Sequence, residues 1–445
     1  MKPMRRRKPP LSTAPIEAVV EKFSHECRGI ARIAGKTTFI QEALPGETVS
    51  FQYIRKKREY DEGRLLSVIT PSKDRVVPRC PHYALCGGCS LQHLAEATQI
   101  HEKQTLLLDL LARVAHSAPE TMLAPLASDA WHYRNKARLS VRYVEKKQAV
   151  LVGFREKNNP RYVTEITTCP VLNAHMDAQL GPLRELLVSL DDPAGIAQVE
   201  VAAGDDALAL ILRTLTPLSV EDEEKIRAFA RLADVRIFLQ AAGPDSVTLF
   251  YPNDGNEYLT YAIDDIRFRF HPTDFTQVNS GLNRLMVQQA LTLLALDPTD
   301  VALDLFCGLG NFTLPMAKQA AFVTGIEGSA TMVSRASMNA RENGITNTAF
   351  QTANLDEVEG LSAWKGRGIS KLLLDPPRTG ALEIVKQMQR IQPERIVYVS
   401  CNPATFARDA ELLVNTQGYR LAAVGIMDMF PHTAHMESMA LFVRK

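Results

Sequence analysis

The sequence lacks any segment suited to a membrane. Nowhere in its 445 residues does an apolar run approach the roughly 18 residues of a membrane span. The N-terminus, MKPMRRRKPP, is basic, but no apolar stretch follows it as in a secretory signal. We therefore expect a cytoplasmic protein with no membrane partner.

An excess of charge of either sign is also missing. The chain has 51 Lys and Arg against 50 Asp and Glu, a formal net charge of +1. Overall charge therefore gives no argument for nucleic-acid binding, which must come from local patches. There is no internal repeat of solenoid length, and the chain length favours roughly two to four domains.

Cysteine is scarce and unevenly distributed. The seven cysteines are an odd number, which does not fit a secreted disulfide framework. Cys80, Cys86 and Cys89 lie close together in CPHYALCGGCS, and Cys169 can supply a fourth thiolate to a metal. A radical S-adenosylmethionine enzyme usually has a different spacing from the gaps of five and two residues found here. Zinc accepts the same ligands as an iron–sulfur cluster, with His82 or His93 as further candidates, so spacing alone leaves both open.

Three domains follow from the pattern of apolar residues. After a basic arm at 1–12, short alternating runs predict a small five-stranded β-barrel over 13–73. Mixed strands and helices predict an α+β domain over 74–272, and strand–helix alternation predicts a doubly wound, mostly parallel sheet over 273–445. Apolar residues at helical spacing predict a helix over about 91–115 that packs on the third domain: Leu107, Leu110, Leu111 and Val114.

A glycine-bearing loop follows the first strand of the third domain, in VALDLFCGLGNFTLP. Gly308 and Gly310 allow a ligand to approach the backbone, and a helix start at Asn311 offers N–H groups. The dinucleotide fingerprint has a third glycine where this chain has Thr313, which weakens a pyrophosphate-binding interpretation. The loop alone is a weak signal.

Polar side chains end the neighbouring strands. Glu327 ends the second strand, where it can accept hydrogen bonds from ribose hydroxyls, while Asn354 ends the third and Asp375 the fourth. Because the carboxyl ends of parallel strands meet at one edge of a doubly wound sheet, we expect all of them at that edge. The set favours an S-adenosylmethionine-dependent methyltransferase over a nicotinamide enzyme or an α/β domain without a ligand.

A cysteine follows the fifth strand, in RIVYVSCNPATFARD. Cys401 is expected at the N-terminus of a helix, where the helix dipole should lower the thiol pKa and favour the nucleophilic thiolate. A buried structural cysteine is the alternative. Glu437 precedes the last strand and can face the same cleft, although a solvated loop glutamate is equally compatible with the spacing. Cys307, inside the glycine loop, is a weaker candidate nucleophile.

These groups suit methylation of a uracil ring. Carbon 5 becomes nucleophilic once a thiolate has added to carbon 6, and a base must then remove the carbon-5 proton so that the thiolate can leave. Cys401 and Glu437 can perform these steps beside a methyl donor in the glycine loop. Asp375 is placed to hold the ring.

The motifs DLFCGLGNFTLP, LLLDPPR, VSCNPATFARD and HMESM resemble those of the RNA uracil-5-methyltransferase family. The likeness covers nearly the whole chain apart from the basic arm, and the region around LPGE at 44–47 resembles the OB-like TRAM RNA-binding module. The resemblance implies a Rossmann-like class I methyltransferase domain, with Cys401 as nucleophile and Glu437 as base. It also implies six residues in contact with S-adenosylmethionine: Gln277, Phe306, Asn311, Glu327, Asn354 and Asp375.

The resemblance also bears on the metal and on the RNA. The family's 23S ribosomal RNA branch holds a [4Fe–4S] cluster with four cysteines, which match Cys80, Cys86, Cys89 and Cys169. The tRNA branch generally lacks both the barrel and these cysteines. We therefore expect a monomer that methylates a uridine flipped out of 23S ribosomal RNA. The alternatives are the same chemistry on tRNA and a non-catalytic RNA-binding iron–sulfur protein.

Local basic patches support an RNA partner. If WHYRNKARLSVRY at 131–143 is one strand, alternate positions place basic side chains on one face: His132, Arg134, Lys136, Arg138 and Arg142. A solvated strand face is the alternative. Arg5–Lys8 and Arg55–Arg58 would add phosphate contacts, which would make binding depend on salt.

Overall fold

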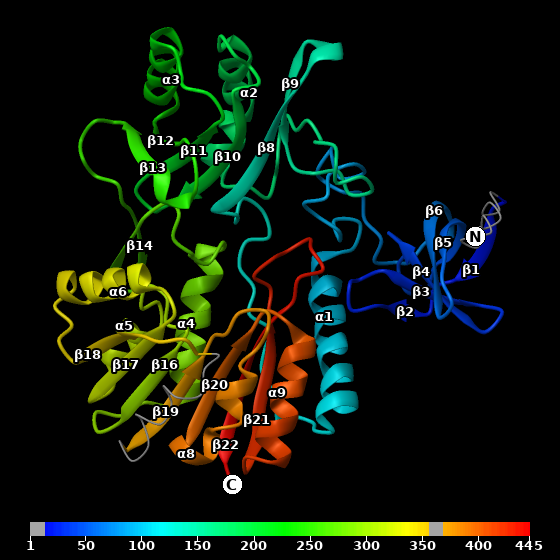
Figure 1. Cartoon of the computed structure of the whole chain (residues 1–445). Helices are drawn as coiled ribbons and strands as arrows, with labels where there is room; N and C mark the ends of the chain where they lie inside the picture. The colour runs from blue at the N-terminus through cyan, green and yellow to red at the C-terminus, as the bar shows by residue number, and fades with distance from the viewer. Residues whose placement is uncertain (1–13, 356–367) are drawn as a thin grey trace, which may run out of the picture. The chain divides into compact units, whose positions relative to one another are not determined.

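The computed structural model of the protein describes residues 14–355 and 368–445 (Figure 1). Helices and strands are mixed along this chain, which confirms the α/β class expected from the sequence. Within these residues no helix combines the length and the apolar character needed to cross a membrane. The basic arm at 1–12 lies outside the described residues.

The described residues group into two compact units. The first contains three segments: the N-terminal part through Arg79, Cys89–Leu106 and His432–His435. The second contains the other three: Cys80–Gly88, Leu107–Pro431 and Met436–Lys445. A short segment near the C-terminus thus belongs to the unit formed by the N-terminal part.

The first unit contains a six-stranded sheet, in the order β1-β5-β6-β4-β3-β2. Its strands are β1 (Ile16–Val19), β2 (Lys22–Phe23), β3 (Gly29–Ile33), β4 (Lys36–Gln41), β5 (Thr48–Lys56) and β6 (Tyr60–Thr70). The sequence predicts five strands, and this number is wrong. The chain changes partner after Val19, because β1 pairs with β5 whereas β2 pairs with β3.

The LPGE turn before β5 ties this sheet to the segment that leaves it. The Glu47 side chain is fully buried, and its carboxylate accepts hydrogen bonds from Leu44 N (2.8 Å) and from Arg75 Nη2 (2.8 Å). Burial alone would raise the pKa of this carboxyl, but the Arg75 guanidinium and the backbone donors hold it below its usual value. Glu47 therefore supports the first unit as a buried, fully paired anion.

The helix expected over about 91–115 is present, with a change in its last turn. It comprises α1 (Glu96–Leu110) and one turn of π-helix, η1 (Leu111–Ala115). Leu107 and Leu111 are fully buried as predicted, but Val114 is 40% exposed and Ala115 is buried in its place. A π-helical turn holds one extra residue, so the buried face moves by one position.

The second unit contains a six-stranded sheet in the order β13-β12-β11-β10-β8-β9. Its elements are β8 (Lys136–Val144), η2 (Glu145–Lys147), β9 (Ala149–Gly153), α2 (Ala174–Ser189), β10 (Ile196–Ala203), β11 (Leu208–Thr214), α3 (Val220–Ala233), β12 (Val235–Gln240), η3 (Pro244–Ser246) and β13 (Val247–Tyr251). The prediction that 131–143 form one strand with a basic face is wrong for 131–135, because β8 begins only at Lys136. Arg138 and Arg142 are exposed as expected.

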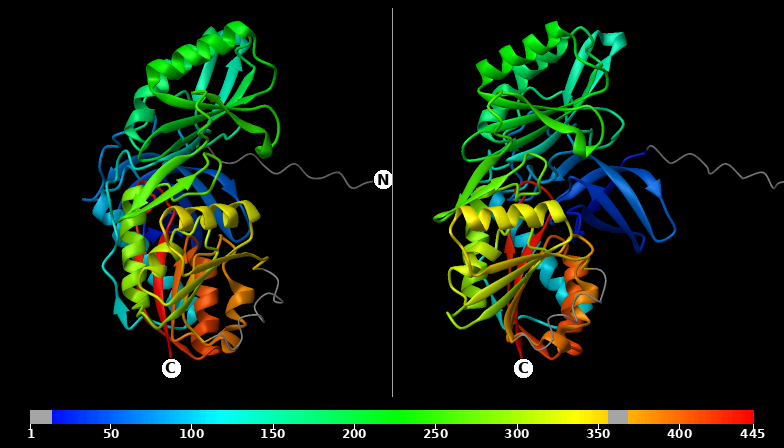
Figure 2. Two further views of the ribbon diagram at one scale, coloured as in Figure 1. Left: turned by 90° about the vertical axis from the view of Figure 1, so that its left-hand side faces the viewer. Right: turned by 60° about the vertical axis from the view of Figure 1, so that its left-hand side comes forward.

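The same unit contains an eight-stranded sheet in the order β18-β17-β16-β19-β20-β22-β21-β7. The elements that build and flank it are β7 (Thr121–Met122), β14 (Leu259–Ile263), β15 (Ile266–Phe270), α4 (Ser280–Leu294), β16 (Val301–Leu305), α5 (Thr313–Ala317), β17 (Phe322–Glu327), α6 (Ala330–Glu342), β18 (Thr348–Thr352), β19 (Ile369–Leu374), α7 (Leu382–Val385), α8 (Met388–Ile391), β20 (Arg395–Ser400), α9 (Pro403–Asn415), β21 (Tyr419–Met427) and β22 (Glu437–Arg444). The five strands from β16 to β20 are parallel, and β22 is antiparallel to both of its neighbours. Figure 2 shows α4 and α9 on opposite faces of this sheet, which confirms the doubly wound architecture.

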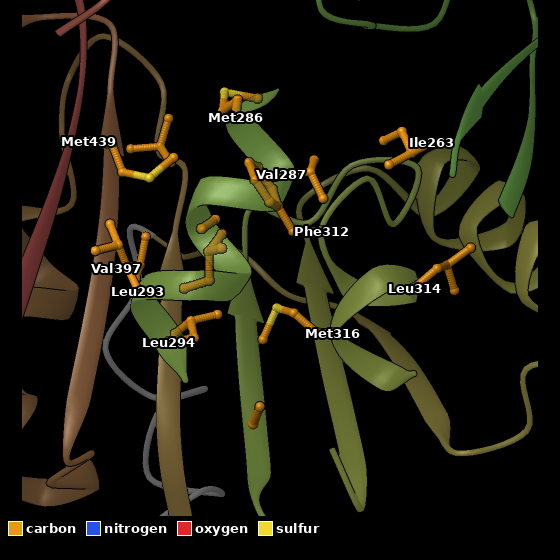
Figure 3. Packing of buried hydrophobic residues seen from close by; sticks show 14 of the residues in the cluster. Ile263, Met286, Val287, Leu293, Leu294, Phe312, Leu314, Met316, Val397 and Met439 are labelled. Carbon is orange, nitrogen blue, oxygen red and sulfur yellow. The ribbon is translucent and has the colours of Figure 1, made fainter. Parts of the chain in front are cut away.

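The core of this sheet lies mainly against α4. Figure 3 shows Leu293 and Leu294 of α4 near Val397 of β20 and Met439 of β22. Asn279 begins the helix, because its side-chain oxygen accepts a hydrogen bond from Leu282 N (3.0 Å). This packing fixes the strands whose ends form the site.

Candidate active site

The carboxyl edge of the eight-stranded sheet gathers most of the residues singled out in the sequence. Phe306, Asp375 and Cys401 directly follow β16, β19 and β20, while Glu327 ends β17 and Asn354 follows β18. Glu437 reaches the same edge by another route, because β22 runs antiparallel to β20 and begins there, with Ser438 opposite Ser400.

The glycine loop folds through three left-handed residues. Phe306, Gly308 and Gly310 have φ values of +68°, +54° and +87°. The left-handed region is unusual for Phe306, whose N–H donates to the Ile326 carbonyl oxygen (2.9 Å). Gly308 N donates to Glu327 Oε2 (3.3 Å), so the carboxylate expected to bind ribose lies against this loop.

Thr313 stands where a dinucleotide fingerprint has glycine, and the structure explains it. Its hydroxyl donates to Asp304 Oδ2 (2.5 Å), and both residues are fully buried. Burial raises the pKa of the Asp304 carboxyl to about 7, with a smaller contribution from the negative charge of Asp375. Thr313 therefore stabilises the end of β16 through this hydrogen bond. A glycine that leaves room for a pyrophosphate is not present at this position.

Asn311 is held by two residues that the sequence does not single out. Its Oδ1 accepts hydrogen bonds from Tyr261 Oη (2.9 Å) and Asn283 Nδ2 (3.0 Å), and its Nδ2 donates to Asn283 Oδ1 (2.9 Å). Tyr261 is itself stacked on Phe268, with ring centroids 4.9 Å apart. No local pattern marks Asn283 or Tyr261, since they reach Asn311 only in the folded chain.

Gln277 lies half-buried in the segment between β15 and α4. This segment is anchored at Asp274, whose carboxylate pairs with Arg335 of α6 (2.8 Å) and accepts a hydrogen bond from His271 N (2.6 Å). Lys136 of β8 donates to the Asp274 carbonyl oxygen. These contacts hold the backbone that carries Gln277.

The loop after Asp375 is fastened to the helix that follows Cys401. The Arg378 carbonyl oxygen accepts hydrogen bonds from Asn402 Nδ2 (2.9 Å) and Thr405 Oγ1 (3.2 Å). Asp409 of α9 is fully buried and accepts hydrogen bonds from Ala381 N (2.7 Å), the Tyr398 hydroxyl (2.7 Å) and the Arg408 guanidinium (2.8 Å). The motifs LLLDPPR and VSCNPATFARD are thus two halves of one rigid structure.

The thiol of Cys401 is not activated in the way the sequence suggests. Burial raises its pKa to about 11, and the charges of Glu437 and Asp375 raise it further, while Arg378 acts in the opposite direction. The prediction of a lowered pKa is therefore wrong. The site places carboxylates around the thiol, and together with burial they outweigh the helix dipole.

The carboxyl groups of the edge share this environment. Burial raises the pKa of Asp375 to about 7 and that of Glu437 to about 8, the latter with a contribution from the charge of Asp375. A carboxyl group with a pKa near neutral pH can both accept and return a proton. The edge can therefore attract a cation, present a thiol and supply a base.

Three of the four predicted metal ligands lie in the second unit. Burial raises the pKa of Cys86, with a smaller contribution from the charge of Cys80. Asp177 accepts a hydrogen bond from Cys169 N (2.5 Å), and its charge also contributes to the raised pKa of Cys80, for which burial is the larger cause. Across residues 14–355 and 368–445, no group of three or more His, Cys, Asp or Glu side chains is arranged to hold a metal ion.

The raised carboxyl pKa values predict how stability depends on pH. Asp304, Asp375 and Glu437 bind protons more tightly in the folded than in the unfolded protein, so their stabilisation is complete below about pH 4 and is lost as the pH rises to about 8. Asp375→Asn should make this fall shallower in urea unfolding followed between about pH 4 and pH 8. Asp265→Asn is the control, because this exposed carboxyl has a pKa lowered by Lys318. An unchanged slope in Asp375→Asn would contradict the environment described above.

Comparisons with known proteins identify relatives over most of the chain. The family model described as tRNA (Uracil-5-)-methyltransferase matches residues 95–445. A Legionella pneumophila (strain Lens) protein named 23S rRNA (uracil(1939)-C(5))-methyltransferase RlmD is 58% identical over 441 residues, 99% of each chain. A protein of the same name from Hahella chejuensis is 48% identical over 446 residues, also 99% of each.

A solved structure has the same fold. It is the Pyrococcus abyssi tRNA (uracil-54, C5)-methyltransferase in complex with S-adenosyl-L-homocysteine, with a TM-score of 0.73 and 23% identity. The match covers 96% of this chain and 100% of that one. With the family model and relatives that align over nearly all of its length, the chain belongs to the tRNA (uracil-5-)-methyltransferase family.

Proposed function

We propose that the protein transfers a methyl group from S-adenosylmethionine to carbon 5 of a uridine in 23S ribosomal RNA. The observation that carries this proposal is the juxtaposition of Cys401 and Glu437 at one edge, where β20 ends and the adjacent strand β22 begins. The names of the curated relatives support the ribosomal substrate.

In the proposed reaction Cys401 is the nucleophile and Glu437 is the base. The Cys401 thiol loses its proton to solvent, the thiolate adds to carbon 6 of the uracil, and the electron pair of the 5,6 double bond moves towards carbon 5 and the adjoining carbonyl. Carbon 5 then forms a bond to the methyl carbon, while the sulfonium sulfur keeps the electron pair of the bond that breaks. Glu437 takes the proton from carbon 5, the double bond re-forms, and the Cys401 thiolate leaves.

The acidic edge suits the methyl donor. S-adenosylmethionine supplies an electrophilic methyl group on a positively charged sulfur. Six residues are proposed to contact it: Gln277, Phe306, Asn311, Glu327, Asn354 and Asp375. A cation among these carboxylates would offset the negative charges that raise the pKa of the Cys401 thiol, which would make the thiolate accessible only once the donor is bound.

RNA binding is proposed for both units. The sheet at residues 16–70 is interpreted as a TRAM module, and its exposed run Arg55–Arg58 would contact phosphates together with Arg138 and Arg142. The target base must leave its stack to reach Cys401. A cytoplasmic location follows from a ribosomal substrate, and a monomeric state stays a prediction.

Methyl transfer from labelled S-adenosylmethionine tests the substrate and the nucleophile together. We expect incorporation into 23S ribosomal RNA and little into tRNA, and we expect Cys401→Ala to lose at least about a thousandfold in turnover because the ring is no longer activated. Cys307→Ala is the matched control, since Cys307 is a buried thiol in the glycine loop and should not be needed. Preference for tRNA would overturn the ribosomal assignment. An inactive protein on both RNAs would favour a non-catalytic RNA-binding role.

The cysteine set is proposed to hold a [4Fe–4S] cluster that stabilises the loop around it. The proposal rests on the thiolate chemistry of Cys80, Cys86, Cys89 and Cys169 and on the family resemblance. The loop that carries the first two is already fixed to its neighbour, because Gly87 N donates to the Arg155 carbonyl oxygen (2.9 Å). All four thiolates would be used as ligands, so the cluster would not take part in methyl transfer.

Anaerobic purification tests the cluster. We expect about four iron and four sulfide ions per chain with a charge-transfer absorption, and we expect Cys169→Ser to lose most of both. Cys27→Ser is the control, because Cys27 is a buried cysteine outside the set. Zinc without sulfide in the purified protein would identify a zinc site instead.

A further inference from the structure

The residues just before Glu437 are fastened to the first unit. Ser90 N and Leu91 N both donate to the His432 carbonyl oxygen (2.9 Å each), and Ala434 N donates to Ser90 Oγ (2.9 Å). Ala434 also packs against the apolar side chains of this unit: Phe23, Cys27, Leu44, Leu91 and Leu94. The chain leaves this anchored segment at His435 and begins β22 two residues later.

Gln99 of α1 also binds this segment. Its Oε1 accepts a hydrogen bond from His432 N (2.9 Å), and its Nε2 donates to His432 Nδ1 (3.2 Å). The same Nε2 also lies within hydrogen-bond distance of the carbonyl oxygens of Leu91 (3.1 Å) and Leu94 (2.8 Å), so its two N–H groups are shared among three acceptors. Gln99 is 1% exposed, so one buried amide binds both the backbone and the ring of His432.

His432 adopts a conformation that needs this support. Its φ is +65°, in the left-handed region that costs about 1 kcal/mol or more for a residue other than glycine. Its N–H, its carbonyl oxygen and its ring nitrogen Nδ1 are all used in the contacts described above. The left-handed conformation of His432 before β22 is therefore supported by its neighbours, and Gln99 contacts both its backbone and its ring.

We infer that Gln99 is a positioning residue for the base of the reaction. By fixing His432, it sets where the chain enters β22 and hence where Glu437 stands relative to carbon 5 of the uracil. The inference rests on the proposed function, because it takes Glu437 as the group that removes the proton. Addition of Cys401 and transfer of the methyl group precede that step and do not depend on it.

The order of the steps provides a test in which a loss of folding and a misplaced base give different results. In RNA that contains 5-fluorouridine, carbon 5 carries fluorine, so Glu437 has no proton to remove and the methylated adduct on Cys401 persists. Gln99→Met keeps the volume of the side chain and removes its hydrogen bonds to His432, Leu91 and Leu94. We expect its turnover on natural RNA to fall about tenfold or more, while the rate of adduct formation with 5-fluorouridine RNA stays within about twofold of the wild type.

Two control variants separate a misplaced base from a general loss of stability. Glu437→Gln should show the same split between turnover and adduct formation, in a stronger form. Glu47→Gln removes a buried carboxylate of the first unit that does not touch His432, and it should lower the melting temperature without the split. If Gln99→Met lowers both rates equally or changes neither, Gln99 is not a positioning residue. If Glu437→Gln keeps full turnover, the proposed base is wrong whatever Gln99 does.

Discussion

The position of one antiparallel strand governs the rest of the site. β22 is inserted between β20 and β21, so it begins where β20 ends and brings Glu437 beside Cys401 from a distant part of the chain. If the last strand were parallel like β16 to β20, its first residue would lie at the opposite edge of the sheet. The thiol and the carboxyl group therefore meet because of topology, and the inferred role of the His432 segment is to fix the point at which the chain enters β22.

Electrostatics at this edge oppose the nucleophile in the absence of a cation. Burial and the charges of Glu437 and Asp375 raise the pKa of the Cys401 thiol to about 11, and burial brings Asp375 and Glu437 close to neutral pKa values. An edge of this kind suits a ligand that arrives with a positive charge. In the proposed reaction, a bound sulfonium would offset the part of the raised thiol pKa that comes from these negative charges, and the base would act last.

Much of this was accessible from the sequence, because periodicity and strand-end position are local signals. The strand–turn–helix rhythm places Glu327, Asp375 and Cys401 at one edge without knowledge of any contact. The pKa of Cys401 could not be predicted in this way, because its sign depends on which charges the folded chain brings near it. For the same reason the sequence gives no sign of Asn283 beside Asn311 or of Gln99 beside His432, since each pair is distant along the chain.

The central claim is that Cys401 forms a covalent bond to the uracil ring. The most direct measurement is mass spectrometry of peptides from the protein after incubation with S-adenosylmethionine and 23S ribosomal RNA that contains 5-fluorouridine. The account predicts a methylated 5-fluorouridine nucleotide attached to the peptide that contains Cys401. A nucleotide attached to Cys307 or to another cysteine, or methylated RNA with no adduct at all, would contradict it.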